Sequence, residues 1–244
     1  FYPPHPEVQE HMRFLADRNL SRIVIIHDPD PFDAKVSQLY KEEAGKNNVA
    51  ILGEFESLLD EKDFRTILTR AKSLEPDAVF IIIFQVGEAG NILRNMTELD
   101  FDVPLLSTSS VQTQTLLDLY ADIAQDRFFY SYPDLDSREY KLFQDKFQAK
   151  YARLPIGPTA ATSYDATRAV LHAIKQGART GTEIKDALYQ LRMPGTVVNE
   201  ISFNAMGQIN TSPFVMKTIR NGEFVKVEET EWNNCSFSEL FSYF

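Results

Sequence analysis

The sequence has few of the residues that build covalent or metal-bound sites. It contains one cysteine, Cys235, so neither an internal disulfide nor a pair of thiols sharing a metal can form. The four histidines fall in separate predicted elements, and none has the spacing of a metal-binding motif. We therefore expect no bound metal ion and no cofactor.

Positive charge and long apolar runs are also scarce. The 244 residues include 25 Lys and Arg against 35 Asp and Glu, a formal net charge of −10. Nucleic-acid affinity depends largely on clustered Lys and Arg, so we expect no nucleic-acid partner. The longest strongly apolar stretch, 78–84, is far shorter than the ~20 residues of a membrane-spanning helix. Residues 1–6 lack a starting Met and the pattern of a signal peptide, which predicts a processed or excerpted chain.

Signatures of catalysis are missing as well. There is no Walker loop, no Gly-x-Gly-x-x-Gly and no Gly-x-Ser-x-Gly turn. The nearest approach to a dinucleotide signature is Gly87 and Gly90, two glycines that are too few and badly spaced to cradle a pyrophosphate. We predict that the protein is not an enzyme, and a nucleotide-binding α/β enzyme domain stays open only as a second alternative.

The chain does have enough apolar residues, 43%, to bury a normal core. Strand-like runs alternate with helical periodicity over the first 135 residues. The predicted strands are 22–28, 49–55, 78–84, 103–107 and 127–132, and the predicted helices are 8–19, 34–46, 63–74, 88–99 and 113–120. This alternation predicts an α/β fold with a doubly wound parallel sheet, in which ligands bind beyond the carboxyl ends of the strands.

The remainder of the chain has a different pattern. Three more helices are predicted at 137–151, 159–176 and 182–191, with a proline- and glycine-containing segment, 154–158, as a hinge or crossing. The last part is β-rich, with strands at 196–203, 214–219 and 224–227 and a hairpin signal at Asn221-Gly222. The tail from 228 onward has no clear periodicity.

The order of these elements and several short phrases resemble a known family. The phrases are residues 21–28, 62–64, 76–80, 163–166 and 201–208. The chain is similar to the Leu/Ile/Val-binding receptors of ABC transporters, which have the type I periplasmic binding fold. The resemblance implies two lobes, the first incomplete: lobe two over 1–135, a crossover with returning lobe-one helices over 136–204, and a C-terminal β-hairpin and tail over 205–244.

If the resemblance holds, the helices within 159–191 pack on a sheet that this chain does not supply. Their apolar stripe would then be exposed, or covered by a dimer partner or by a missing N-terminal segment. The stripe includes Val170, Leu171, Ile174, Ile184, Leu188 and Leu191.

The resemblance also implies a ligand site made by loops that follow successive strands of lobe two. The corresponding residues are Phe32, Phe84, Gln85, Ser107, Thr108, Ser109 and Ser110. Each has a structural alternative. The ring of Phe32 could pack on the next helix, Phe84 could close the core, and the four hydroxyl residues could cap a helix. Gln85 is the most informative, because its amide both donates and accepts hydrogen bonds.

The chain departs from the family at two points. The family has Tyr-Gly where this chain has Phe32-Asp33, and it has an acidic residue near Ser109 that pairs with the ligand's ammonium group. A buried ammonium needs a carboxylate, so either Asp30, Asp33 or Glu88 supplies it, or the ligand is not an ordinary α-amino acid. The second option is favoured. Tyr164 and Asp165 match a family phrase, and for Asp165 a structural role near the helix start is favoured.

These features predict an extracytoplasmic solute-binding protein of an ABC transporter. It would bind a small amino-acid-like or carboxylate ligand in a cleft between lobes, close by hinge motion, and be recognised by a membrane permease. The expected location is periplasmic or extracellular, with a lipid anchor on the full-length protein as a further option. The alternative is the ligand-sensing extracellular domain of a receptor or sensor kinase with the same fold.

Overall fold

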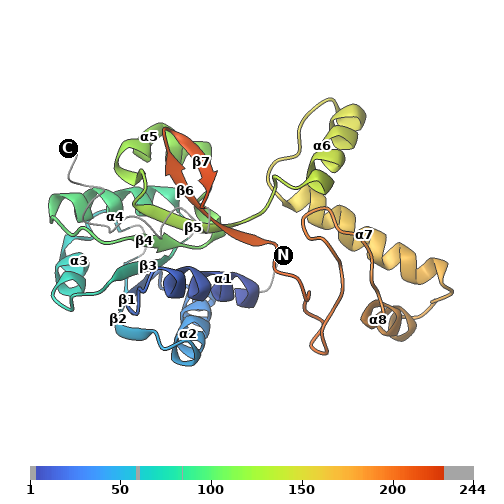
Figure 1. The fold of residues 1–244 in the computed structure, drawn as a ribbon, viewed down its shortest axis with the longest axis horizontal. Coiled ribbons are helices and arrows are strands. Elements are labelled where there is room, and N and C mark those ends of the chain that lie inside the picture. Colours follow the sequence, from blue (N-terminus) through green and yellow to red (C-terminus); the bar gives the residue numbers. More distant parts are fainter. Residues whose placement is uncertain (1–3, 59–60, 84, 228–244) are drawn as a thin grey trace. The chain divides into compact units, whose positions relative to one another are not determined.

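The computed structural model describes residues 4–58, 61–83 and 85–227 (Figure 1). The chain divides into two compact units. We call residues 7–132 with 215–244 the sheet unit, and residues 133–214 with 1–6 the helical unit. The chain passes from one unit to the other at 6/7, at 132/133 near the end of β5 and at 214/215 at the start of β6.

The sheet has seven strands in the order β2-β1-β3-β4-β5-β6-β7. Neighbouring strands from β2 to β5 are parallel. The strands are β1 (Arg22–His27), β2 (Ala50–Glu56), β3 (Ala78–Ile82), β4 (Leu105–Ser107), β5 (Phe128–Pro133), β6 (Phe214–Arg220) and β7 (Glu223–Lys226). The predicted parallel α/β sheet is confirmed, and every strand predicted before residue 135 is present.

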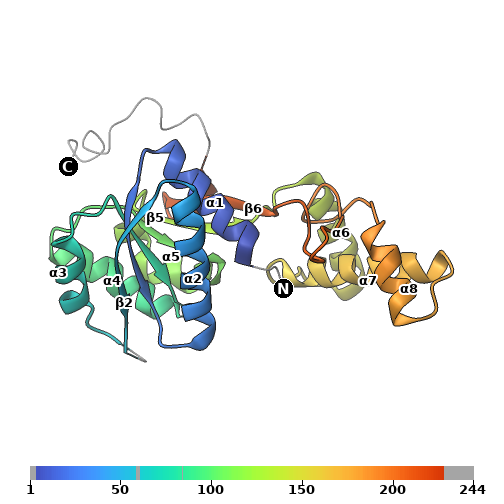
Figure 2. The ribbon, with the colours of Figure 1, turned by 90° about the horizontal axis from the view of Figure 1, so that it is seen from below.

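Helices cover both faces of this sheet, because the central strands are apolar on both sides. Successive β1 side chains alternate, so Val24 and Ile26 belong to one core and Ile23 and Ile25 to the other. Helices α3 (Arg65–Lys72), α4 (Val86–Glu98) and α5 (Gln114–Ala124) cover the first core. Helices α1 (Pro4–Asp17) and α2 (Pro31–Lys46) cover the second (Figure 2). This is the predicted doubly wound arrangement.

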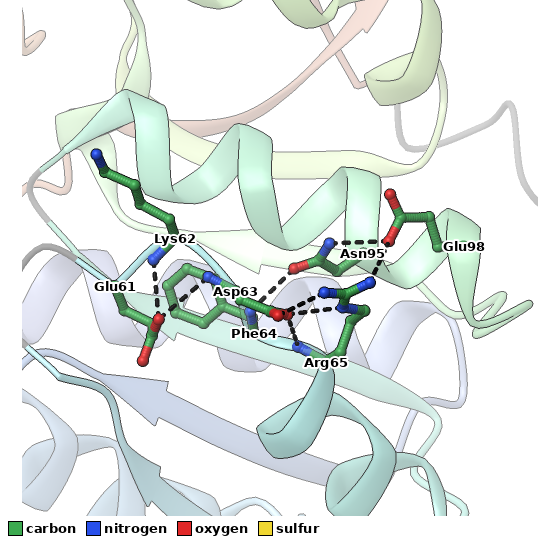
Figure 3. A network of polar contacts seen from close by, with 7 residues as sticks. All are labelled: Glu61, Lys62, Asp63, Phe64, Arg65, Asn95 and Glu98. Atoms are coloured by element: carbon green, nitrogen blue, oxygen red, sulfur yellow. Dashed lines mark hydrogen bonds and ion pairs between the residues drawn. The ribbon is translucent and has the colours of Figure 1, made fainter.

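The side chain of Asn95, on α4, fixes the start of the neighbouring helix α3. Its Oδ1 accepts a hydrogen bond from the backbone N–H of Phe64 at 2.9 Å, and its Nδ2 donates to Glu98 at 3.1 Å (Figure 3). Asp63 adds an ion pair to Arg65 at 2.6 Å. Phe64 precedes the first residue of α3, so Asn95 satisfies one of the backbone donors that a helix start leaves open.

The hairpin of β6 and β7 lies at the edge of the sheet next to β5. The two strands are antiparallel, with Arg220 paired to Glu223 across a two-residue turn. Asn221 and Gly222 both have positive φ, 53° and 73°, which is the conformation that the Asn-Gly pair favours in a tight hairpin. The predicted hairpin is confirmed, and it extends the sheet of the sheet unit.

The helical unit consists of α6 (Arg138–Tyr151), α7 (Thr159–Lys175), α8 (Gly181–Tyr189) and an irregular segment, 190–213. Segment 154–158 joins α6 to α7 inside this unit. The boundaries between the two units fall at 6/7, 132/133 and 214/215, and not at this segment, for which a hinge or crossing was predicted.

The prediction of a strand at 196–203 is wrong, because the described residues between α8 and β6 form no strand. The segment forms only isolated bridges, Met193 with Ile201 and Phe203 with Ile209. The backbone N–H of Thr196 donates to a side chain, the carboxylate of Asp165, at 2.6 Å. In this segment the Thr196 N–H is therefore satisfied by a side chain and the bridges are isolated, so no extended ladder of strand hydrogen bonds forms.

The apolar stripe of α7 is exposed where the sequence predicted exposure. Val170, Leu171 and Ile174 are 39%, 49% and 38% exposed, and Ile184 and Leu188 on α8 are half-buried. Leu191 is the exception, because it packs with Ala169 and Ile201 and is buried. No helix in the described residues is long and apolar enough to span a membrane.

Candidate functional site

Three loops of the sheet unit begin at the same edge of the sheet. They follow β1, β3 and β4, which are adjacent parallel strands. The register places His27 beside Ile82, and Ile81 beside Ser107, so the three carboxyl ends are level. We refer to these three loops as the strand-end loops. Open α/β sheets bind ligands at this edge.

The loop after β1 carries Phe32 on the first turn of α2. Asp30 caps this helix, accepting a hydrogen bond from the Phe32 N–H at 2.7 Å, and Pro31 occupies the first helical position. The Phe32 ring is 40% exposed. The capping residue and the proline together fix the start of α2 and so the position of the Phe32 backbone. Contact of the Phe32 ring with a ligand remains a prediction.

Asp33 follows Phe32 and is placed differently. It is 1% exposed, and neither carboxylate oxygen has a hydrogen-bond partner among the described residues. Burial, with the nearby charges of Asp28 and Asp30, raises the pKa of Asp33 to about 7. Asp28 has a donor of its own, the Ser57 hydroxyl at 2.9 Å.

The loop after β3 contains Phe84 and Gln85. Phe84 lies outside the described residues, so its predicted role stays a prediction. Gln85 is exposed and directly precedes α4, in an extended conformation. Its amide does not cap the helix. Gln85 thus lies at a strand end, and its contact with a ligand stays a prediction.

The loop after β4 begins with a buried residue. Ser107 is 0% exposed, and its carbonyl oxygen lies 3.0 Å from Nε2 of His11. Thr108, Ser109 and Ser110 are half-buried. The Ser110 hydroxyl donates to the Ile83 carbonyl at 2.7 Å, which ties this loop to the end of β3. Of the four hydroxyl residues, the last three are therefore the ones near solvent.

Glu7 and His11, on α1, form hydrogen bonds with the backbone of this loop, and neither was predicted from the sequence as a site residue. Glu7 Oε1 accepts hydrogen bonds from the Ser109 N–H at 2.6 Å and from the Ser131 hydroxyl at 2.5 Å. Burial raises the pKa of Glu7, and these two bonds oppose the rise. Glu7 lies more than a hundred positions from Ser109 in a helix without any motif, so no local pattern marks it.

His11 is fully buried between the loop and the core. Its Nδ1 lies 2.7 Å from the Tyr40 hydroxyl, and its Nε2 contacts Ser107. Burial lowers the pKa of His11 from 6.5 to about 4, so the ring is neutral near pH 7. A neutral ring matches these contacts, one nitrogen donating to the carbonyl and the other accepting from the hydroxyl.

Asp165 has the structural role that the sequence favoured, for a different reason. It lies beyond the first turn of α7 and is buried. Its Oδ2 accepts from the N–H and the hydroxyl of Thr196 at 2.6 and 2.7 Å, and Oδ1 pairs with Arg168 at 2.9 Å. The carboxylate therefore holds the irregular segment against α7, instead of interacting with the helix start.

The helical unit contains a separate groove of about 650 Å³ between α6 and α7. Aromatic side chains, including Phe147, Tyr151 and Tyr164, line it together with Lys146 and Lys150. Across the described ranges, no set of three His, Cys, Asp or Glu side chains is grouped so that it could hold a metal ion.

A family model described as periplasmic binding protein matches residues 1–223, which is most of the chain. The chain belongs to this family. The predicted resemblance is confirmed, and because the family consists of binding proteins, so is the prediction of a non-enzymatic protein.

Solved bacterial binding proteins have the same fold. An ABC transporter substrate-binding protein from Desulfitobacterium hafniense, in complex with Leu, is 18% identical with a TM-score of 0.72, covering 92% of this chain and 66% of its own. A branched-chain amino acid ABC transporter periplasmic ligand-binding protein from Burkholderia xenovorans is 13% identical with a TM-score of 0.77, covering 93% and 63%. A solute-binding protein from R. palustris, in complex with benzoate, is 15% identical with a TM-score of 0.69, covering 91% and 62%.

The chain thus spans about two thirds of the length of these structures. At such low identity the likeness establishes the fold alone. No curated protein matches the sequence.

Proposed function

We propose that this chain is the ligand-binding part of an extracytoplasmic solute-binding protein of an ABC transporter. Its ligand is a small amino-acid-like or carboxylate molecule, held by the strand-end loops. The contacts are Phe32, Gln85 and the hydroxyl loop 108–110, with Phe84 and the backbone of Ser107 completing the set.

The observation that carries the proposal is the level arrangement of three loops at one edge of a parallel sheet, in a member of a family of binding proteins. Each loop contributes a chemically different contact. Phe32 offers an apolar ring, Gln85 an amide, and loop 108–110 hydroxyl groups. A few polar groups beside an aromatic surface suit a small ligand that has a polar end and an apolar end.

Two finer features belong to the proposal. The ligand is held between two lobes that close on a hinge, and a membrane permease recognises the closed form. The protein acts in the periplasm or outside the cell. Family membership supports both features, and the similar solved proteins with bound Leu or benzoate support the ligand class.

Thermal unfolding with a ligand panel tests this function. The panel contains leucine, benzoate, aliphatic carboxylates, NAD and ATP, each at up to millimolar concentration. A ligand present at 100 times its Kd stabilises the folded state by about 2.7 kcal/mol, a measurable rise in Tm. We expect a rise with an amino acid or a carboxylate, reduced by Gln85→Ala, and none with the nucleotides. A rise with NAD or ATP alone would contradict the proposal.

A further inference from the structure

The loop after β1 and the first turn of α2 hold three carboxylates, and of these three Asp33 alone has no hydrogen-bond donor among the described residues. Asp28 accepts from the Ser57 hydroxyl at 2.9 Å, and Asp30 accepts from the Phe32 N–H at 2.7 Å. Both oxygens of Asp33 are buried without a partner among the described residues. Asp33 is also the most buried of the three, at 1% exposure.

A buried carboxylate without donors is unfavourable, because it has lost its hydration and gained nothing in return. The like charges of Asp28 and Asp30 add to the effect, and together with burial they raise the pKa of Asp33 to about 7. Near neutral pH the group is therefore poised between its two protonation states. A cation placed beside it would favour the ionised form and remove the penalty.

The neighbouring basic groups do not offset this penalty: the interaction with His27 lowers the pKa of Asp33, but burial and the charges of Asp28 and Asp30 outweigh it. Lys41 on α2 pairs with Glu54 at 2.9 Å, and His27 Nε2 lies 3.5 Å from the same carboxylate. Both basic groups are thus directed toward Glu54 on β2. A metal ion is an unsuitable partner, since these acidic side chains are not among any set of three grouped for metal binding within the described residues.

We propose that Asp33 is the counter-ion for an ammonium group on the ligand, an inference that rests on the proposed function. Asp33 follows Phe32 in the first turn of α2, which starts at the strand-end edge of the sheet. The Phe32 ring is 40% exposed and Asp33 is 1% exposed, so the two side chains point in different directions and an ammonium group has to pass Phe32 to reach Asp33. Ser109 offers no charge, and Glu7 already accepts two hydrogen bonds through one oxygen. Because Asp33 is covered, the 28–33 loop has to shift for the two charges to meet.

Three probes with related skeletons test this inference. Leucine carries both charged groups, 4-methylpentanoate has the carboxylate without the ammonium, and 3-methylbutylamine has the ammonium without the carboxylate. The readout is the pH titration of the Asp33 carboxyl carbon by 13C NMR, which needs no substitution. We expect leucine and the amine to lower the pKa of Asp33 by about one unit or more, and 4-methylpentanoate to leave it unchanged.

Affinity measurements on matched variants complete the test. Asp33→Asn should weaken leucine binding at least about tenfold and leave 4-methylpentanoate binding within about twofold. Asp30→Asn makes the same charge change three residues away and keeps a helix-capping side chain. Because it also removes a like charge that raises the pKa of Asp33, it should bind leucine as tightly as the wild type or slightly more tightly.

Two results overturn the inference while the proposed function stands. In the first, the probes bind but Asp33→Asn weakens leucine and 4-methylpentanoate equally. In the second, Glu7→Gln, and not Asp33→Asn, removes the preference for leucine. If none of the three probes binds or alters the Asp33 titration, the inference is overturned. The benzoate, nucleotide and other carboxylate members of the ligand panel then decide the proposed function separately.

Discussion

At the scale of single residues, His11 joins α1 to the core and to the loop after β4. Its lowered pKa, about 4 against 6.5, means that the unfolded chain takes up a proton in this range before the folded chain does. The contribution of the neutral, buried His11 ring to the free energy of unfolding is therefore present above pH 6.5 and is lost as the pH falls toward 4.

We expect the His11 ring to stay neutral down to about pH 4, and the urea midpoint of the wild type, measured relative to that of His11→Gln, to fall between pH 6.5 and 4. Ring proton shifts in NMR spectra measure the first, and urea titrations the second. A ring that titrates near its ordinary value of 6.5 would show that His11 is not buried as described.

The effect of Asp33 on the pH dependence of stability is opposite to that of His11. Its folded pKa, about 7, lies above its ordinary value of 3.8, so the folded chain holds the proton more tightly. Its contribution to stability is present below about pH 4 and is lost as the pH rises through about 7. Asp33→Asn should therefore gain stability relative to the wild type between pH 4 and pH 8. Paired urea titrations at the two pH values check this, and a pH-independent difference would contradict it.

Asn95 provides a test of the helix layer. Asn95→Ala removes the acceptor for the Phe64 N–H and should cost about 1–3 kcal/mol, because that donor is buried. Asn91→Ala, one turn earlier on the same helix and half-buried, is the control and should change stability by less than about 0.5 kcal/mol. Chemical denaturation measures both. Equal losses would mean that the Phe64 contact does not matter.

At the scale of elements, two glycines on α4 differ in their surroundings. A Cβ at Gly90 would lie 2.1–2.4 Å from the ring of Tyr120 on α5, whereas one at Gly87 meets nothing within 4 Å. Gly90→Ala should therefore destabilise by about 1–3 kcal/mol, since the packed ring has to move.

Gly87→Ala should instead stabilise by up to about 1 kcal/mol, because alanine is the better helix former. The two substitutions add the same methyl group to the same helix, so the difference in urea midpoint isolates the contact with α5. If both variants are stabilised, α4 and α5 do not pack closely at Gly90.

The elements with strong local signals are the ones that the sequence predicted well. Apolar β-branched runs such as 22–27 and 78–82 give strands buried on both faces, and Asn221-Gly222 gives the hairpin turn. The prediction of a strand at 196–203 failed where Asp165, whose tertiary contact periodicity does not reveal, accepts the hydrogen bond of the Thr196 N–H.

The residues of the candidate site also fall into two groups, those that the sequence could predict and those that it could not. Phe32, Gln85 and Ser109 could be named from the sequence because the resemblance to the family implies them, and the topology of parallel strands places their loops at one edge. Glu7 could not, because it reaches Ser109 only through tertiary packing. Asp33 was one of several possible counter-ions, and only its burial and lack of donors distinguish it from Asp30.

At the scale of the whole molecule, the chain passes between its two units at 6/7, 132/133 and 214/215. The segments that follow β5 and precede β6 are joined by a hydrogen bond from the Asp134 N–H to the Pro213 carbonyl at 2.7 Å. Paired crossing segments of this kind suit a hinge, which absorbs motion in a few terminal residues of elements. The exposed stripe of α7 at Val170, Leu171 and Ile174 belongs to the helical unit alone.

The central claim is that ligands bind at the strand-end loops. Titration of the 15N-labelled chain with leucine, followed by amide chemical shifts, tests it most directly. We expect the largest shifts at Phe32, Gln85 and residues 108–110, with those lining the groove between α6 and α7 unchanged. Shifts confined to that groove, or spread evenly over both units, would contradict the claim.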